Sequence, residues 1–91
     1  MYDAARRCFV VNANFARSFE KIGDVANAKL FDGKARTAYD MAFYSAKELG
    51  IPEEQVKRDV DAATQAELPR LVRDQAYLTA SAKFCKERGM M

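Results

Sequence analysis

Cysteine is the residue type in this chain whose positions suggest covalent chemistry. Cys8 lies near the beginning, Cys85 lies near the end, and no histidine occurs among the 91 residues. A redox pair usually has the C-x-x-C spacing, and a zinc site on two cysteines would have to recruit carboxylates. Two interpretations remain open: a structural disulfide between the first and last helices, or two separate buried thiols that act as small apolar side chains.

A bond between Cys8 and Cys85 would affect both stability and location. Closing a loop of nearly the whole domain stabilises the fold by roughly 4–4.5 kcal/mol through the lost entropy of the unfolded chain. That is comparable with the net stability of about 5 kcal/mol expected for a small domain. Because such bonds persist in oxidising surroundings, a disulfide predicts the bacterial periplasm or the cell exterior. Free cysteines would instead predict the cytoplasm.

The segment that begins at Met1 has no apolar core like that of a signal peptide. A periplasmic location therefore requires that a signal was removed and that Met1 belongs to the expressed chain. Otherwise the protein stays where it is made. No uninterrupted apolar run approaches the length needed to cross a bilayer, so we expect no membrane span.

Residues suited to catalysis are scarce. The absence of histidine removes the usual triads, the commonest general base and the Glu-x-x-His di-iron pattern. No glycine-rich phosphate loop occurs, and Ser45 and Ser81 fall inside predicted helices, without the strained turn that exposes a nucleophile. We therefore predict no enzyme activity, no cofactor, no metal site and no small-molecule substrate.

The charge pattern predicts a solvated surface. The formal net charge is +2, and basic and acidic residues alternate along most of the chain. A phosphate-binding stripe would need Lys and Arg on one side without carboxylates between them. The nearest candidates would share a region if the last two helices are neighbours, and they are Arg70, Arg73, Lys83, Lys86 and Arg88. We therefore do not expect nucleic acid as the partner.

Hydrophobic periodicity predicts an all-α fold, a compact four-helix bundle in one domain of residues 1–91. The first helix covers residues 3–22, and a long second helix over residues 25–49 is expected at the centre. Their apolar stripes end at Ile22 and Leu49. A third helix starts at Pro52 and should kink or break near Pro69. A fourth covers about residues 75–88, after which the terminal methionines should fray.

Aromatic and methionine side chains outside the apolar stripes form the candidate partner-binding surface. Around Met41 to Tyr44 the second helix is apolar on nearly every side, so this segment is either central to the bundle or half-buried in a second protein. Rings outside a small core tend to anchor partners, although a compact bundle can also need them for packing. The candidates are Phe9, Met41, Phe43, Tyr44 and Tyr77.

The layout resembles short all-helical, two-cysteine proteins of the proteobacterial periplasm, whose function is unknown. They share a cysteine in the first helix, a G-D turn, a long helix rich in Tyr and Ala that ends L-G-[I/L]-[P/S]-E-x-x-V, and a cysteine in the last helix. The resemblance covers nearly the full chain and implies a periplasmic protein. The matching residues are Cys8, Gly23-Asp24, Tyr39 to Ala46, Leu49-Gly50-Ile51-Pro52-Glu53 with Val56, and Cys85.

In size, helicity and disulfide the chain is also similar to the small helical immunity proteins that neutralise toxins of bacterial secretion systems. We therefore expect a non-enzymatic, periplasmic protein-binding domain, with an inhibitor or immunity factor as its specific form. The partner would be another protein or a second copy of the chain. The alternative is a cytosolic helical regulator, such as a phage-type inhibitor or a nucleic-acid binder.

Overall fold

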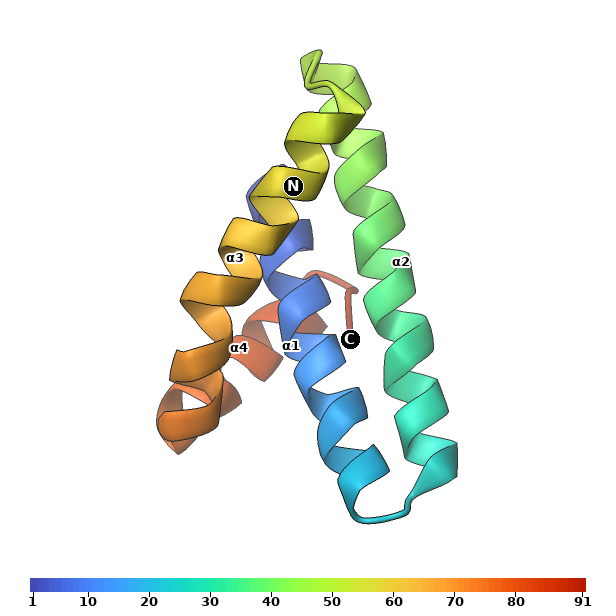
Figure 1. Cartoon of the computed structure of the whole chain (residues 1–91), viewed down its shortest axis with the longest axis vertical. Helices are drawn as coiled ribbons and strands as arrows, with labels where there is room; N and C mark the ends of the chain where they lie inside the picture. Colours follow the sequence, from blue (N-terminus) through green and yellow to red (C-terminus); the bar gives the residue numbers. More distant parts are fainter.

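The computed structural model describes all 91 residues and contains four α-helices and no strand. The helices are α1 (Tyr2–Lys21), α2 (Val25–Leu49), α3 (Glu53–Arg73) and α4 (Gln75–Glu87) (Figure 1). The radius of gyration is 12.8 Å and the principal extents are 40 × 25 × 23 Å. The predicted all-α bundle with a long second helix is confirmed, since α2 has 25 residues.

Local signals in the sequence explain where the helices begin and end. Gly50 ends α2 with a φ of 74°, a left-handed conformation that favours glycine. The amide of Ile51 then donates to the carbonyl of Ala46 at 2.8 Å. Asp24 and Asp74 cap α2 and α4, because their carboxylates accept hydrogen bonds from backbone amides at the helix starts.

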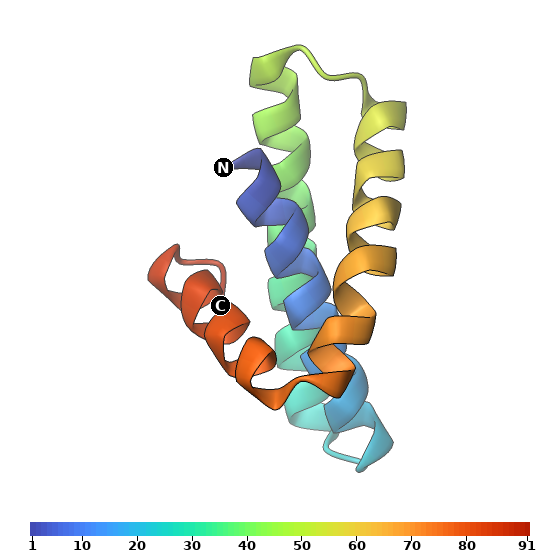
Figure 2. The same cartoon turned by 90° about the vertical axis from the view of Figure 1, so that its left-hand side faces the viewer.

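Pro69 lies inside α3 without breaking it. The helix continues past the proline to Arg73, although a proline has no amide hydrogen for the helical bond to the carbonyl four residues earlier. Pro69 is exposed, so its ring faces solvent. Figure 2 shows the end of α3 curving inward toward the start of α4. The chain thus bends at this position and reverses direction only at Asp74.

The helix at the centre of the bundle is α1. It contacts all three other helices, whereas α2 and α4 make no contact with each other. Figure 2 shows α3 and α4 on opposite sides of α1. The long helix α2 packs mainly against α1 and more lightly against α3. The central position expected for the second helix therefore belongs to the first, and much of α2 is left facing outward.

The core forms around α1 and contains the two cysteines. Cys8 and Cys85 form a disulfide with their Cα atoms 5.7 Å apart, and both residues are fully buried. The predicted pairing is confirmed. The small residues Ala38, Ala42 and Ala46 of α2 are fully or almost fully buried against α1. The other core residues are Tyr2, Ala5, Val10, Val11, Val56, Val60, Leu71 and Met90.

Two expectations about the core are wrong. Ile22 and Leu49, which continue the apolar stripes, are 75% and 66% exposed because they lie at helix ends that extend beyond the neighbouring helices. The terminal methionines do not fray. Met90 is 3% exposed, and its carbonyl accepts a hydrogen bond of 2.8 Å from the buried side chain of Asn12. The tail therefore folds back against α1.

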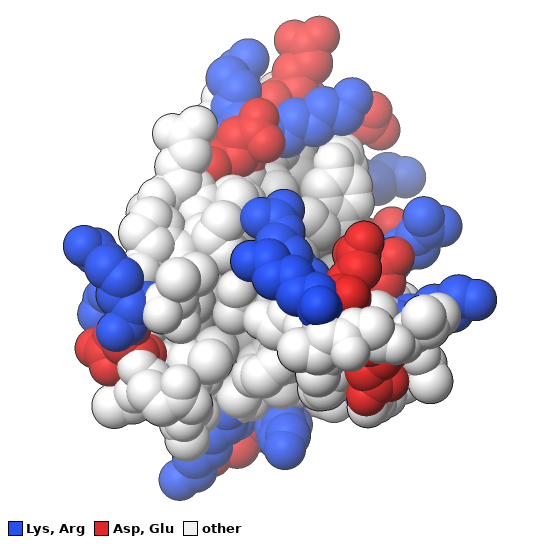
Figure 3. Space-filling view, turned by 60° about the horizontal axis from the view of Figure 1, so that its bottom comes forward, with Lys and Arg blue, Asp and Glu red and all other residues white.

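Charged side chains cover the surface in a mixed pattern. Figure 3 shows one face on which basic and acidic groups lie close together around a broad uncharged area. The last two helices are neighbours, and two of the predicted basic residues lie over aromatic rings of α4. Arg70 lies 3.8 Å from the ring centre of Tyr77, and Arg88 lies 3.5 Å from that of Phe84.

Candidate protein-binding surface

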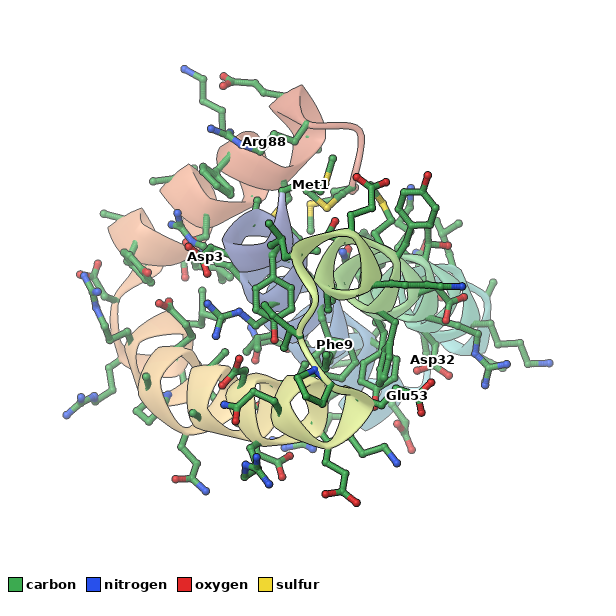
Figure 4. The ribbon with its side chains drawn as sticks, turned by 90° about the horizontal axis from the view of Figure 1, so that it is seen from above. Met1, Asp3, Phe9, Asp32, Glu53 and Arg88 are labelled. Atoms are coloured by element: carbon green, nitrogen blue, oxygen red, sulfur yellow. A yellow bond between two sulfur atoms is a disulfide. The ribbon has the colours of Figure 1, made fainter.

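The five residues predicted to bind a partner fall in three separate places. Phe9 and Phe43 are half-buried and flank Tyr39, with ring centres 5.3 and 5.0 Å from the Tyr39 ring. Figure 4 shows Phe9 pointing between α2 and α3. A small groove of about 490 Å³ lies beside it, with walls from α1, α2 and α3. Phe9 and Phe43 thus contribute to packing between helices.

Tyr77 belongs to the contact between α3 and α4. Its hydroxyl donates a hydrogen bond to the carboxylate of Glu67. Burial and this hydrogen bond raise the pKa of Tyr77 above its ordinary value. Arg7 lies between the rings of Tyr77 and Phe84, at 5.4 and 4.4 Å from their centres, and donates to Ser81 at 2.8 Å. These contacts within the chain already engage Tyr77.

Met41 and Tyr44 line the largest concave surface of the molecule. This surface, here called the α2 groove, has a volume of about 800 Å³ and lies between α2 and the first residues of the chain. In the view from above of Figure 4, Met1 lies between α4 and α2. The lining residues are Met1, Tyr2, Thr37, Asp40, Met41, Tyr44, Ser45, Glu48 and Leu49.

A second hollow continues the α2 groove along the same helix. It has a volume of about 490 Å³, lies between α2 and the C-terminal tail, and shares Thr37 with the first. We call it the tail groove. Lys34 crosses it, because its ammonium donates to a Met91 oxygen at 2.8 Å. The lining residues are Lys29, Leu30, Gly33, Lys34, Thr37, Gly89, Met90 and Met91.

The two grooves expose apolar side chains that an isolated bundle would normally cover. Met1, Tyr44 and Leu49 are 68%, 69% and 66% exposed, and Leu30 is 53% exposed. Single exposed apolar residues are ordinary, but several that line one concave surface, as Met1, Tyr44 and Leu49 do, are typical of an interaction site. The two grooves therefore present apolar side chains that no other part of this chain covers.

Charges on the two grooves are segregated. The α2 groove carries the carboxylates of Asp40 and Glu48, whereas the tail groove carries the ammonium groups of Lys29 and Lys34. A hydrogen bond to Glu48, with the charge of that carboxylate, raises the pKa of Tyr44 above its ordinary value. The Tyr44 hydroxyl is thus already engaged by Glu48 at the rim of the groove.

No group of three or more His, Cys, Asp or Glu side chains is placed to hold a metal ion. The hydroxyl of Ser81 is buried and accepts from Arg7. None of the four helices combines the length and the apolar character that a membrane crossing requires. What the grooves offer is apolar contact area with charged ends.

Sequence reasoning found Met41 and Tyr44 but missed Met1, Leu30 and Thr37 as members of the same surface. The signal that could have found two of them is the spacing of Leu30, Thr37 and Tyr44, each two turns from the next on one side of a helix. The place of Met1 depends on how α1 docks on α2, which no local pattern reveals.

Comparison of the chain with protein-family models, with curated proteins and with solved structures finds no match.

Proposed function

We propose that this chain is a non-enzymatic protein-binding domain of an oxidising compartment, the bacterial periplasm, and that the α2 groove with the tail groove is its binding surface. The observation that carries the proposal is that the exposed apolar side chains of Leu30, Tyr44 and Leu49 line two adjoining hollows along α2. Apolar anchors flanked by charged groups are the usual composition of a protein interface.

The disulfide supports the location in this proposal. Cys8 and Cys85 are both fully buried, so the bond is shielded from reductants and thiol exchange. Buried structural disulfides of this kind are typical of exported proteins. An inhibitor or immunity factor is the specific form that we propose, because such proteins combine small size, helicity and a disulfide.

Site-directed photo-crosslinking tests the binding surface. A photoreactive amino acid at Tyr44, in protein exported to the periplasm of a bacterial host, should give a discrete adduct with another protein chain. The matched control places the same probe at Arg58, an exposed residue of α3 outside both grooves. Equal yields at the two positions, or no adduct at Tyr44, would contradict the proposal.

Mass spectrometry tests the compartment. Protein recovered from the periplasm should be lighter than the reduced chain by one pair of hydrogen atoms and should not react with a thiol reagent before reduction. Free thiols in the exported protein would overturn the proposed location.

A cytosolic regulator that binds nucleic acid is the second candidate. The observation favouring it is the cluster of Arg7, Arg70 and Arg88 around the rings of Tyr77 and Phe84, since arginines and aromatic rings together are typical of single-strand binding. Retention on single-stranded DNA that weakens steeply with salt would support it. Failure to bind at low salt would remove it.

A further inference from the structure

The outward face of α2 carries a regular pattern that the fold itself does not use. Exposed residues recur at alternating spacings of four and three, so their side chains form one stripe on the helix. This is the spacing by which two long helices pack against each other. The stripe consists of Ala26, Leu30, Gly33, Thr37, Asp40 and Tyr44, all of them exposed.

The stripe is complementary to itself about Thr37. Leu30 and Tyr44 lie seven residues on either side of Thr37, and Lys34 and Asp40 lie three residues on either side. In a pair of antiparallel helices related by a twofold axis, residues equally distant from the crossing point face each other. If two copies of α2 cross at Thr37, Leu30 faces Tyr44 of the second copy and Lys34 faces its Asp40.

Gly33 fits the same arrangement. A glycine inside a helix costs about 1 kcal/mol relative to alanine, and an added Cβ at Gly33 would have no atom within 4 Å. Nothing within the chain therefore requires a glycine there. Gly33 and Met41 lie four residues on either side of Thr37, so the antiparallel pair places the Met41 side chain of one copy over the open space at Gly33 of the other.

The charges select the antiparallel orientation. In each copy, Lys29 and Lys34 line one end of the continuous surface and Asp40 and Glu48 line the other. Parallel helices would bring like charges together, whereas antiparallel helices bring opposite charges together at both ends. Like-charge contacts cost several kcal/mol, and opposite charges fix the register. The charges of this surface therefore favour a second copy in the antiparallel orientation.

We infer that the partner of the α2 surface is a second copy of this chain, in a twofold dimer with antiparallel α2 helices crossing at Thr37. This inference rests on the proposed function, since it names the occupant of the same surface. Each copy would insert its exposed ridge at Leu30 and Tyr44 into the grooves of the other. The dimer leaves α3 and the arginine cluster around Tyr77 and Phe84 outside the interface.

Complementary charge reversal tests the inference. Lys34→Asp places two carboxylates opposite each other at both symmetric contacts, and Asp40→Lys places two ammonium groups there. Light scattering should give the wild type twice the mass of one chain and should give each variant alone a dissociation constant raised roughly tenfold or more. An equimolar mixture of the two variants restores both opposite-charge contacts, so its dimer should form with an affinity near that of the wild type.

The mixture also separates the interface from folding. Lys34→Asp removes the hydrogen bond to Met91, and Asp40→Lys cannot replace it, so recovery of the dimer in the mixture requires contact between chains. Lys57→Asp, on the exposed side of α3, is the matched control and should dimerise like the wild type. A monomeric wild type at millimolar concentration, unchanged dimers in both variants, or a mixture that stays monomeric would overturn the inference.

The two proposals fail in distinguishable ways. If the wild type is monomeric and the probe at Tyr44 joins the chain to a foreign protein, the binding surface stands and the second copy is rejected as its occupant. If the probe at Tyr44 gives no adduct and the chain is monomeric, both proposals are rejected. An adduct of twice the chain mass from Tyr44, together with the restored mixed dimer, supports both.

Discussion

At the residue scale, Tyr2 shows how one side chain ties α1 to α3. Tyr2 is 8% exposed, and its hydroxyl donates to the carboxylate of Asp59 at 2.7 Å. Gln55 donates to the other oxygen of the same carboxylate at 2.7 Å. Burial, with the hydrogen bond to Asp59, raises the pKa of Tyr2 to about 12, and the hydrogen bonds from Tyr2 and Gln55 lower the pKa of Asp59.

These pKa shifts predict how stability depends on pH. The folded state keeps the Tyr2 proton while the unfolded chain loses it near pH 10, so this contribution is present below pH 10 and is lost as the pH rises to about 12. The contribution of Asp59 is present above its unfolded pKa and is lost as the pH falls through its lowered pKa. Tyr2→Phe should flatten both limbs of a plot of urea midpoint against pH. A variant with the wild-type slopes would contradict this account.

Asn12 is a second residue whose effect reaches across the molecule. It is fully buried, and its amide donates to the carbonyls of Cys8 and Met90 at 2.9 and 2.8 Å. Asn12→Ala should lower the free energy of unfolding by about 1–3 kcal/mol, because the buried Met90 carbonyl loses its partner. Hydrogen exchange should be faster at Met90 in this variant than in Asn14→Ala, a control at another buried position of α1. Equal exchange in the two would show that Asn12 does not hold the tail.

At the scale of elements, two glycines of α2 have opposite effects. Gly33 has a helical backbone with free space around it, whereas Gly50 has the left-handed φ that ends the helix. Gly33→Ala should raise the free energy of unfolding by about 1 kcal/mol through better helix propensity. Gly50→Ala should lower it by about 1–2 kcal/mol through left-handed strain. Urea denaturation of dilute protein checks both signs, and a destabilised Gly33→Ala would mean that the helix needs this glycine within one chain.

At the scale of the whole molecule, the disulfide makes a large contribution to stability that one change can remove. Cys8 and Cys85 are 77 residues apart in sequence, so the closed loop contributes about 4.5 kcal/mol in the loop-entropy model. Reduction should lower the urea midpoint steeply and leave the protein partly unfolded at 25 °C. The double variant Cys8→Ala/Cys85→Ala should behave like the reduced protein and should not respond to the reductant. An unchanged midpoint after complete reduction would contradict the predicted magnitude.

Local signals predicted the elements well because each acts within a few residues. Gly23-Asp24 and Gly50-Ile51-Pro52 mark two turns within one residue of where the structure has them. The disulfide was also predictable, since both cysteines lie on inward faces of their helices. The burial of Met90 was not, because it depends on a hydrogen bond to Asn12, 78 residues earlier in the chain.

The candidate surface was predictable only in part for the same reason. Met41 and Tyr44 stand out in any apolar stretch of the second helix. Phe9, Phe43 and Tyr77 lie in sequence segments similar to those of Met41 and Tyr44. In the structure, however, Phe9 and Phe43 pack against Tyr39, and Tyr77 packs against Arg70. Which ring is covered depends on how the helices dock, and that information is distributed over the whole chain.

The bond between Cys8 and Cys85 has a mechanical consequence. Tension applied to the two ends of the chain passes from the first helix to the last through the sulfur atoms, so everything between them is bypassed and cannot be stretched. A narrow pore through which either end is pulled would meet a covalent ring and would have to thread two strands at once. Cutting the bond converts this ring into an ordinary linear cargo.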